Sequence, residues 1–509
     1  MKNLSIYTDE IWASFAAKVI NADKLKTYKH FDHIFDFARF GEKIKDLVSD
    51  PTLKKIHSHS FVPHVKVLTK TPRYKFDEQL DSFELETKIR PISFSSHFDS
   101  YIYSFYSYAL TEKYQAYVRA KGFDSVVLAY RSDLGGDSNI QFAKSAFDAV
   151  SEMIKKHGSC VAIGLDITGY FDNIDHALLK NKWCEVIEQD ELPIDQYKIF
   201  KSLTKYSYVG KASLMKHFNF NEDKQKWSTL LDIVPNSIIG RGYKEKMDLI
   251  RRRGLVVRNN PKNEADGSIS HRGIPQGSPM SAVLSNIYLL DFDKWLYTRS
   301  KYMGFRYFRY CDDLLIICKP GDAEILNADI VGDIKAKYKL RIQEKKTELI
   351  EFRPNSSGAI RGFNIKTKNG LKTSKATEQR YYKNLQYLGF EFNGSNIYVR
   401  PGSLSRYFRK AKGRIIKTMM MAYGSKSSSD KIFKKQMFER YSHFGKRNFI
   451  TYAQNASKKE YTSSSGITRS GMDSVSIKRQ LSSHFAILQK EILKASGQFA
   501  ANKKLKLKR

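Results

Sequence analysis

Three aspartates stand where the sequence predicts that strands end or turn. Asp166 closes the apolar, β-branched run 161–167, and Asp312, followed by Asp313, lies 146 residues later in the segment RYFRYCDDLLIICK. If these carboxylates converge, they repel one another unless a cation neutralises them. Oxygen ligands select Mg²⁺, and a pair of such ions can activate a hydroxyl and stabilise a leaving pyrophosphate. One aspartate at a turn is more often a cap or a solvated loop residue, so the combination carries the prediction of a nucleotidyl-transfer site.

Short strands and a hairpin are the elements expected to position these aspartates. The run 161–167 predicts a strand, and Asp175 predicts the N-cap of a helix that starts with HALLKNKW. The runs on either side of Cys-Asp-Asp predict a β-hairpin. Further upstream, SSHFDSYIYSFYSYALTEKY predicts a helix with an aromatic face that begins near Ser95. Near the end, one amphipathic helix is predicted from the spacing of Ile477, Leu481, Phe485, Leu488 and Ile492.

The composition points to a nucleic-acid partner. The chain has 509 residues, 41% of them hydrophobic and 13% aromatic, with a formal net charge of +34. This excludes a disordered chain, a collagen or a disulfide scaffold, and the basic excess indicates a polyanionic partner. The charge is uneven, because residues 161–190 hold six acidic against two basic residues, whereas residues 400–450 hold 14 basic against two acidic residues. We therefore expect positive lobes that hold nucleic acid around a negative, metal-binding centre.

The N-terminal residues and the cysteines favour a cytoplasmic protein without a membrane partner. The first 20 residues carry scattered charges instead of the continuous apolar region of a secretion signal. The strongest apolar run, 314–318, is far shorter than the about 20 residues that a transmembrane helix needs. Buried thiols in a reducing compartment are predicted for the four cysteines, which form no C-x2-C pair: Cys160, Cys184, Cys311 and Cys318.

Six motifs resemble those of reverse transcriptases and follow in the same order. The tetrad Tyr-Cys-Asp-Asp at 310–313 resembles the Y-x-D-D box, and DITGYFDNIDH at 166–176 resembles the first carboxylate motif. Between them, GIPQGSPMSAVLSNIYL at 273–289 matches the P-Q-G-x-P-x-S segment. The triphosphate-handling fingers motif, the Lys-Thr motif and the primer-grip hairpin are similar to KIRPIS (88–93), LRIQEKKTELI (340–350) and YLGFEF (387–392).

This resemblance implies an α+β right-hand polymerase, in which a palm with an antiparallel sheet and a catalytic hairpin lies between fingers and a helical thumb. The expected regions are an N-terminal extension (1–85), fingers (86–160), a palm (161–395) with a fingers insertion at about 200–263, and a helical thumb and C-terminal region with a basic tail (396–509).

The resemblance also implies roles for individual residues. Asp166 and Asp312 would bind two Mg²⁺ ions, for which Mn²⁺ can substitute, and Asp313 would assist as a third catalytic metal ligand. Contacts to the incoming dNTP are implied for Lys88, Arg90, Phe171, Gln276, Gly277 and Lys346, with Phe171 as the steric gate against a 2′-hydroxyl. Contacts to primer and template are implied for Tyr387, Leu388, Gly389, Phe390, Arg406, Arg409, Lys410 and Arg414. Ordinary packing for Phe171 and a solvated surface for Arg90 and Lys346 stay open as alternatives.

Within the reverse transcriptases, the spelling of RPISFSSHFDSYIYSFYSYAL and VVLAYRSD is most similar to the bacterial defence-associated "unknown group". That resemblance implies anti-phage activity, a cognate noncoding RNA as template or scaffold, a DNA product and, in some members, a homo-oligomer. Two alternatives stay open. The same active site could perform template-independent or protein-primed DNA synthesis, or the chain could be an RNA-binding scaffold with a vestigial polymerase site.

Overall fold

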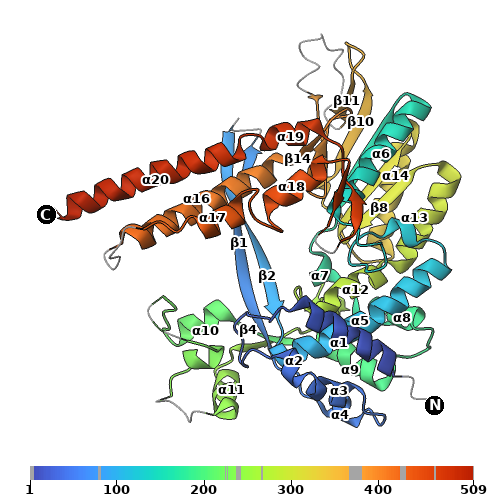
Figure 1. Ribbon diagram of the computed structural model, residues 1–509. Helices are drawn as coiled ribbons and strands as arrows, with labels where there is room; N and C mark the ends of the chain where they lie inside the picture. Colours follow the sequence, from blue (N-terminus) through green and yellow to red (C-terminus); the bar gives the residue numbers. More distant parts are fainter. Residues whose placement is uncertain are drawn as a thin grey trace.

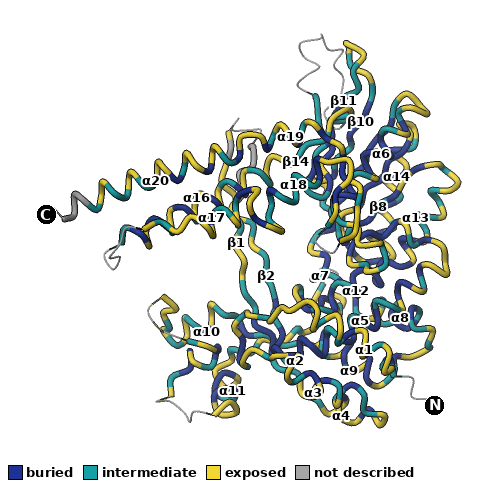
Figure 2. Tube along the Cα trace, viewed as in Figure 1, coloured by how far each residue is buried: buried dark blue, intermediate teal, exposed yellow. Residues whose placement is uncertain are grey.

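The computed structural model describes residues 5–77, 82–223, 225, 227–236, 242–264, 267–365, 381–424, 431–463 and 466–507. These residues form an α+β fold, as predicted, in which helices surround sheets that are mostly antiparallel (Figure 1). Buried residues concentrate around the central sheet, while the helices that extend toward the C-terminus are mostly exposed (Figure 2). All four cysteines are free and buried, which confirms the prediction of buried thiols. Among the described residues, no helix is long and apolar enough to cross a membrane.

The central sheet has the strand order β11-β10-β3-β9-β8. Its strands are β3 (Cys160–Asp166), β8 (Arg306–Tyr310), β9 (Asp313–Cys318), β10 (Glu348–Pro354) and β11 (Ile360–Asn364). Successive side chains of a strand point to opposite faces, and both faces of this sheet are covered. Ala162 and Leu315 pack with α6 (Asn139–His157), whereas Ile163 and Ile316 lie in the cluster that contains α14 (Ala323–Ala336). This two-sided burial explains why β3 and β9 are continuous apolar runs in the sequence.

A long hairpin of β1 (His64–Asp77) and β2 (Ser82–Phe94) reaches from the lower body to the C-terminal helices (Figure 1). The two strands pair from Val65↔Phe94 to Asp77↔Ser82. β1 also pairs in parallel with β4 (Ser207–Gly210), which pairs in turn with β5 (Val256–Arg258). The expected boundary between residues 85 and 86 falls inside β2, and the expected insertion at about 200–263 contributes β4 and β5 to this sheet.

Helices of the N-terminal half pack around α5 (His97–Ala120). The Ser96 hydroxyl caps α5 by accepting a hydrogen bond from the Asp99 backbone N–H at 3.1 Å. Phe105 is buried against α1 (Asp9–Ala22) and Tyr101 packs on Phe37, so the predicted aromatic-faced helix is confirmed. The other helices that precede β8 in the sequence are α2 (Phe37–Phe40), α3 (Glu42–Val48), α4 (Lys54–Ser58), α7 (Tyr170–Asn173), α8 (His176–Val186), α9 (Ile194–Thr204), α10 (Lys211–His217), α11 (Tyr243–Arg252), α12 (Pro279–Tyr288) and α13 (Leu290–Met303).

The C-terminal region contains two long helices, α16 (Pro401–Tyr423) and α20 (His484–Leu507), that lie side by side and extend away from the body (Figure 1). Between them in sequence are α17 (Lys435–Tyr441), α18 (Phe449–Ser457), β15 (Glu460–Thr462), β16 (Thr468–Ser470) and α19 (Val475–Leu481).

The prediction of one final amphipathic helix is wrong, because the chain breaks after Leu481. Ile477 and Leu481 of α19 belong to the core beside the central sheet, whereas Leu488 and Ile492 of α20 pack with α16. The intervening Ser-Ser pair is a poor helix former, because serine hydroxyls compete for backbone hydrogen bonds. Because of this break, the apolar residues of the pattern pack in two separate cores.

Candidate active site

Asp166 and Asp313 lie directly opposite each other where β3 and β9 pair. Residues that face each other across antiparallel strands have Cβ atoms about 4.5–5.5 Å apart on the same face of the sheet. Asp312 lies beside them in the turn that joins β8 to β9, where Tyr310 pairs with Asp313. The predicted hairpin is thus confirmed, and the structure brings the three aspartates together.

The turn itself is held in an unusual backbone conformation. Cys311 has φ of 58°, in the left-handed region that non-glycine residues seldom adopt. The backbone N–H of Ile167 donates to the carbonyl of Asp312 at 3.2 Å, which fixes the turn to the end of β3. Such a conformation persists only where the surroundings determine it, and it is commonest at functional sites.

The electrostatics of the three aspartates favour a cation. Partial desolvation raises the pKa of Asp313 to about 7, with further contributions from the charges of Asp312 and Asp166. Desolvation also raises the pKa of Asp312, and the Asp166 charge adds to that rise. Lys346 and Arg400 oppose the shift at Asp313. A divalent ion would lower both pKa values, because it would compensate the repulsion between the carboxylates.

Lys346 supplies a cation at this site. Its Nζ lies 2.7 Å from Oδ2 of Asp166, and the backbone N–H of Gln343 donates to the Asp166 carbonyl at 2.9 Å. The three carboxylates are hard oxygen ligands of the kind that Mg²⁺ prefers, so the residues fit such an ion. In the side-chain conformations of the described residues, however, no three His, Cys, Asp or Glu side chains lie close enough together to hold a metal ion.

The loop before α12 packs on the fingers strand β2. The Ser93 backbone N–H donates to the carbonyl of Gln276 at 2.8 Å. Gly277 has φ of +116°, and a Cβ there would lie 2.9 Å from the Ser93 carbonyl oxygen, so this close contact requires glycine. The structure therefore brings the predicted nucleotide-binding residues Gln276 and Gly277 against the end of the strand that carries Lys88 and Arg90.

Lys88 and Arg90 lie two residues apart on β2 and so share one face of the hairpin, with both side chains partly buried. The Lys88 charge lowers the raised pKa of Asp312, which places this lysine within electrostatic reach of the catalytic turn. Phe171 is half-buried on α7, and its carbonyl accepts from the Ile274 backbone N–H at 2.9 Å. Its carbonyl thus joins α7 to the loop that holds Gln276.

Comparison with known proteins assigns the central part of the chain. Residues 215–392 match the family described as "Reverse transcriptase (RNA-dependent DNA polymerase)". The chain contains a reverse transcriptase domain. A domain of this family is, by that description, an RNA-dependent DNA polymerase, and the α+β fold with its antiparallel central sheet agrees with the predicted right-hand architecture. The matched residues include Asp312, Asp313 and Lys346, whereas Asp166 precedes them and is joined to them by the pairing of β3 with β9.

Similarity to curated proteins and to solved structures adds little to this family match. No curated protein matches the chain. Among solved structures, telomerase from Candida albicans in complex with a TWJ fragment of telomeric RNA aligns at 13% identity with a TM-score of 0.35, covering 95% of this chain and 68% of that one. The apo telomerase from Candida tropicalis truncated from the C-terminal domain aligns at 11% identity with a TM-score of 0.35, covering 72% of this chain. This chain spans 61% of that structure's length. Scores this low carry no conclusion about the present chain.

A second hairpin of the reverse transcriptase domain lies beside the catalytic turn. It consists of β12 (Leu385–Tyr387) and β13 (Phe390–Phe392), and β13 pairs with β14 (Ile397–Val399). Leu388 and Gly389 form its turn and are partly accessible, whereas Phe390 is fully buried. Tyr387 is also buried, and the charge of Asp313 contributes to its raised pKa. The turn is thus the accessible part of the predicted primer grip.

The basic residues predicted to hold primer and template lie on α16 directly after this hairpin. The backbone N–H of Arg400 donates to the Gly389 carbonyl at 3.0 Å and connects the two elements. Arg406, Arg409 and Lys410 are exposed, opposite the buried Tyr407 and Ala411. A hydrogen bond of 3.2 Å joins Arg409 Nη1 to the Pro72 carbonyl of β1, and another of 3.2 Å joins Arg414 Nη2 to Gln436.

A buried ion pair that was not predicted from the sequence lies beneath the catalytic turn. Arg309 and Asp293 are each fully buried, and Arg309 Nε and Nη2 contact Asp293 Oδ1 and Oδ2 at 2.7 and 2.5 Å. Arg309 Nη1 also donates to the Cys311 carbonyl at 3.3 Å, so the pair holds the turn from below. The available signal was an arginine at an inward position of β8, two residues before the turn.

Proposed function

We propose that this protein is an RNA-directed DNA polymerase that joins dNTPs to a primer by two-metal nucleotidyl transfer. The observation that carries the proposal is the placement of Asp166 opposite Asp313, with Asp312 in the adjoining turn, in a chain that contains a reverse transcriptase domain. Converging carboxylates whose pKa values are raised by burial and mutual repulsion fit a site that binds divalent cations.

Each residue of the site has a part in this reaction. Bound Mg²⁺, or Mn²⁺ in its place, would activate the primer 3′-hydroxyl and stabilise the leaving pyrophosphate. Asp166, Asp312 and Asp313 would hold two such ions. Lys88 and Arg90 would bind triphosphate oxygens by charge-assisted hydrogen bonds, and Lys346 would neutralise or protonate the pyrophosphate.

The partly buried residues around the loop before α12 would select the nucleotide. Phe171 would exclude a ribose 2′-hydroxyl, since an aromatic ring beneath the sugar leaves no room for it. Gln276 and Gly277 would lie against the nascent base pair, because the loop that carries them is fixed to β2. The turn at Leu388 and Gly389 would contact the primer, and Tyr387 and Phe390 would hold that turn in place.

The RNA template and the DNA product would lie along the exposed basic face of α16. Arg406, Arg409 and Lys410 are on that face, and cations there would neutralise backbone phosphates. Arg414, half-buried against Gln436, would act at its edge. This contact is independent of sequence and should weaken as salt rises.

We further propose that the enzyme acts in bacterial defence against phage, as a cytoplasmic homo-oligomer with a cognate noncoding RNA. The support is the similarity of the segments RPISFSSHFDSYIYSFYSYAL and VVLAYRSD to the defence-associated group. Expression in a susceptible bacterium should lower phage plating. Equal plating with the wild-type protein and with an Asp312→Asn, Asp313→Asn variant would reject a defence role that depends on polymerisation.

The polymerase activity has a direct test. Purified protein with its co-purifying RNA should incorporate labelled dNTPs in Mg²⁺, and Asp312→Asn with Asp313→Asn should abolish incorporation. The matched control is Asp190→Asn with Asp223→Asn, which removes two exposed carboxylates elsewhere and should leave the rate unchanged. Incorporation that survives the first pair of changes would refute the metal assignment. DNA that stays covalently attached to the denatured protein would instead indicate protein-primed synthesis.

A further inference from the structure

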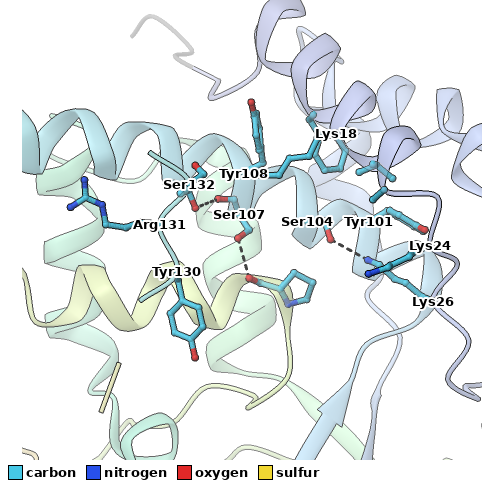
Figure 3. Close-up of a pocket in the computed structure, with 15 residues that line it drawn as sticks. Lys18, Lys24, Lys26, Tyr101, Ser104, Ser107, Tyr108, Tyr130, Arg131 and Ser132 are labelled. Carbon is cyan, nitrogen blue, oxygen red and sulfur yellow. Dashed lines mark hydrogen bonds between the residues drawn. The ribbon is translucent and has the colours of Figure 1, made fainter. Parts of the chain in front are cut away.

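A cavity of about 450 Å³ lies between the N-terminal segment and α5, outside the three aspartates (Figure 3). α1 and the loop after it form one wall, α5 forms the second, and the segment 130–132 with Pro279 forms the third. Its volume lies within the about 300–1,000 Å³ that is usual for small-molecule sites. None of the predicted site residues lines it.

The cavity is strongly cationic. Lys18, Lys24 and Lys26 line it, and its lining includes no aspartate or glutamate. Among the described residues, none of these three lysines has a carboxylate within ion-pair distance. Arg131 also belongs to the lining, but its guanidinium points away from the lysines and is paired with Asp133 at 2.7 Å (Figure 3). Because Lys26 Nζ already donates to Ser100 and Ser104, the exposed Lys18 and Lys24 are the groups available to an anion.

Lys26 is the most enclosed of the three. Its Nζ donates to Ser100 Oγ at 2.6 Å and to Ser104 Oγ at 3.1 Å, and it lies 4.0 Å from the centroid of the Tyr101 ring. Burial lowers its pKa to about 7. A phosphate beside this ammonium would offset the cost of keeping its charge away from water.

Aromatic rings line the same cavity. Tyr101 and Tyr108 come from α5, with Lys18 Nζ 5.0 Å from the Tyr108 ring centroid, and Tyr130 comes from the opposite wall. Cations interleaved with aromatic rings are the combination that binds nucleotides, since the ammonium groups pair with phosphate and the rings stack on bases. Neither a lipid chain nor a peptide carboxylate would use both features.

The third wall connects the cavity to the catalytic centre. Ser107 Oγ donates to the carbonyl of Pro279 at 3.0 Å, and Pro279 is the first residue of α12, directly after the loop with Gln276 and Gly277. The Tyr130 ring centroid lies 6.4 Å from that of Tyr310, next to the catalytic turn. A ligand in the cavity would thus touch segments that continue into the polymerase site.

We propose that this cavity binds a phosphate-bearing nucleotide unit, with Lys18 and Lys24 on the phosphate, the Lys26 charge beside it and the ring of Tyr108 against the base. The same chemistry is offered by a free nucleotide and by one nucleotide of a single-stranded nucleic acid. The site is distinct from the one that holds the incoming dNTP in the proposed reaction.

The test measures binding in the full chain, without polymerisation. In an Asp312→Asn, Asp313→Asn background without Mg²⁺, two probes are titrated at low salt: ATP, and a fluorescent eight-nucleotide single-stranded RNA. Lys18→Gln with Lys24→Gln changes two exposed side chains and should leave folding intact. This variant should lower the affinity for at least one probe roughly tenfold or more. The control, Lys294→Gln with Lys335→Gln, removes the same amount of charge from the exposed faces of α13 and α14. It should lower that affinity less than twofold.

The pattern of loss identifies the source of the nucleotide. Loss of ATP binding supports a free nucleotide, and loss of RNA binding alone supports a strand. In either case Tyr108→Leu, which keeps every charge, should weaken the same probe severalfold. Equal affinities in the Asp312→Asn, Asp313→Asn parent and in the same protein with Lys18→Gln and Lys24→Gln would overturn the proposal. Equal losses in that variant and in the Lys294, Lys335 control would overturn it as well. Since the readout is affinity, this failure is separate from any failure of dNTP incorporation.

Discussion

Lys346 forms an ion pair with Asp166, with 2.7 Å between Nζ and Oδ2. The Lys346 ammonium is therefore bound to a carboxylate that would bind metal in the proposed reaction. A divalent ion that binds Asp166 must compete with this lysine, and the lysine, once displaced, stays near the leaving group. The lysine is half exposed, so the pair itself adds little stability and its consequences should be kinetic.

Lys346→Met should therefore separate two effects. The Mg²⁺ concentration for half-maximal incorporation should fall, because Asp166 no longer has a competing cation. The maximal rate should fall by roughly 100-fold, as is usual when a proton donor to the leaving group is removed. Single-nucleotide incorporation across a Mg²⁺ titration measures both quantities, and Lys346→Arg, which keeps the charge, should stay close to the wild type in its Mg²⁺ dependence. An unchanged Mg²⁺ dependence in Lys346→Met would show that the pair does not compete with the metal.

The buried pair of Arg309 and Asp293 should matter for stability. Asp293→Ala leaves a fully buried guanidinium without its partner, which costs about 3–5 kcal/mol in the free energy of unfolding. Asp329→Ala breaks the partly exposed pair with Arg299 and should cost at most about 1 kcal/mol. Urea denaturation of the two variants makes the comparison, and similar losses would contradict the assignment.

A double substitution separates stability from positioning at this pair. Asp293→Met with Arg309→Met should recover much of the stability, because apolar side chains often replace a buried ion pair without loss. Its incorporation rate should stay low, since the Cys311 carbonyl loses the Arg309 hydrogen bond that holds the catalytic turn. Full activity in this variant would show that the turn does not depend on Arg309.

Gly277 tests the contact between the loop before α12 and the fingers strand. In Gly277→Ala the new Cβ would lie 2.9 Å from the Ser93 carbonyl and 3.0 Å from Ile92 Cγ2, at a φ of +116° that alanine rarely adopts. We expect a loss of about 1–3 kcal/mol and a raised KM for dNTP. Gly332→Ala on α14 has open space around its Cβ and should stabilise the protein by up to about 1 kcal/mol. A Gly277→Ala variant with an unchanged KM would mean that this loop does not position the nucleotide.

The elements that carry the aspartates could be predicted from local sequence patterns. β3, the hairpin around Asp312 and the Asp175 cap of α8 are each determined by residues close in sequence, and each was predicted. The pairing of Asp166 with Asp313 joins residues far apart, and only the resemblance of motifs suggested it. Arg309 was missed because nothing near it in sequence indicates that Asp293 is its partner. The last helix was wrong because helical spacing does not say whether two apolar groups belong to one core or to two.

Lys26 should make stability depend on pH. Its pKa is lowered from 10.5 to about 7 by burial among Ser100, Ser104 and Tyr101, with Lys18 and Lys24 sharing the cavity. Between these two values the unfolded chain binds the proton and the folded chain does not, so the free energy of unfolding rises with pH across this window. Below pH 7 both states are protonated and the folded state bears the full cost of the buried charge.

Lys26→Met removes this dependence. Relative to the wild type, the variant should be most stable below pH 7, and the difference in the free energy of unfolding should narrow by about 3 kcal/mol as pH rises to 9.5. Urea denaturation of both proteins at pH 6.5 and 9.5 gives the two differences, and subtraction cancels the titration of all other groups that the substitution leaves alone. Lys335→Met, at an exposed position on α14, should show no such narrowing. A difference that stays constant with pH would mean that Lys26 keeps its ordinary pKa in the folded protein, and that the cavity is open enough to hydrate it.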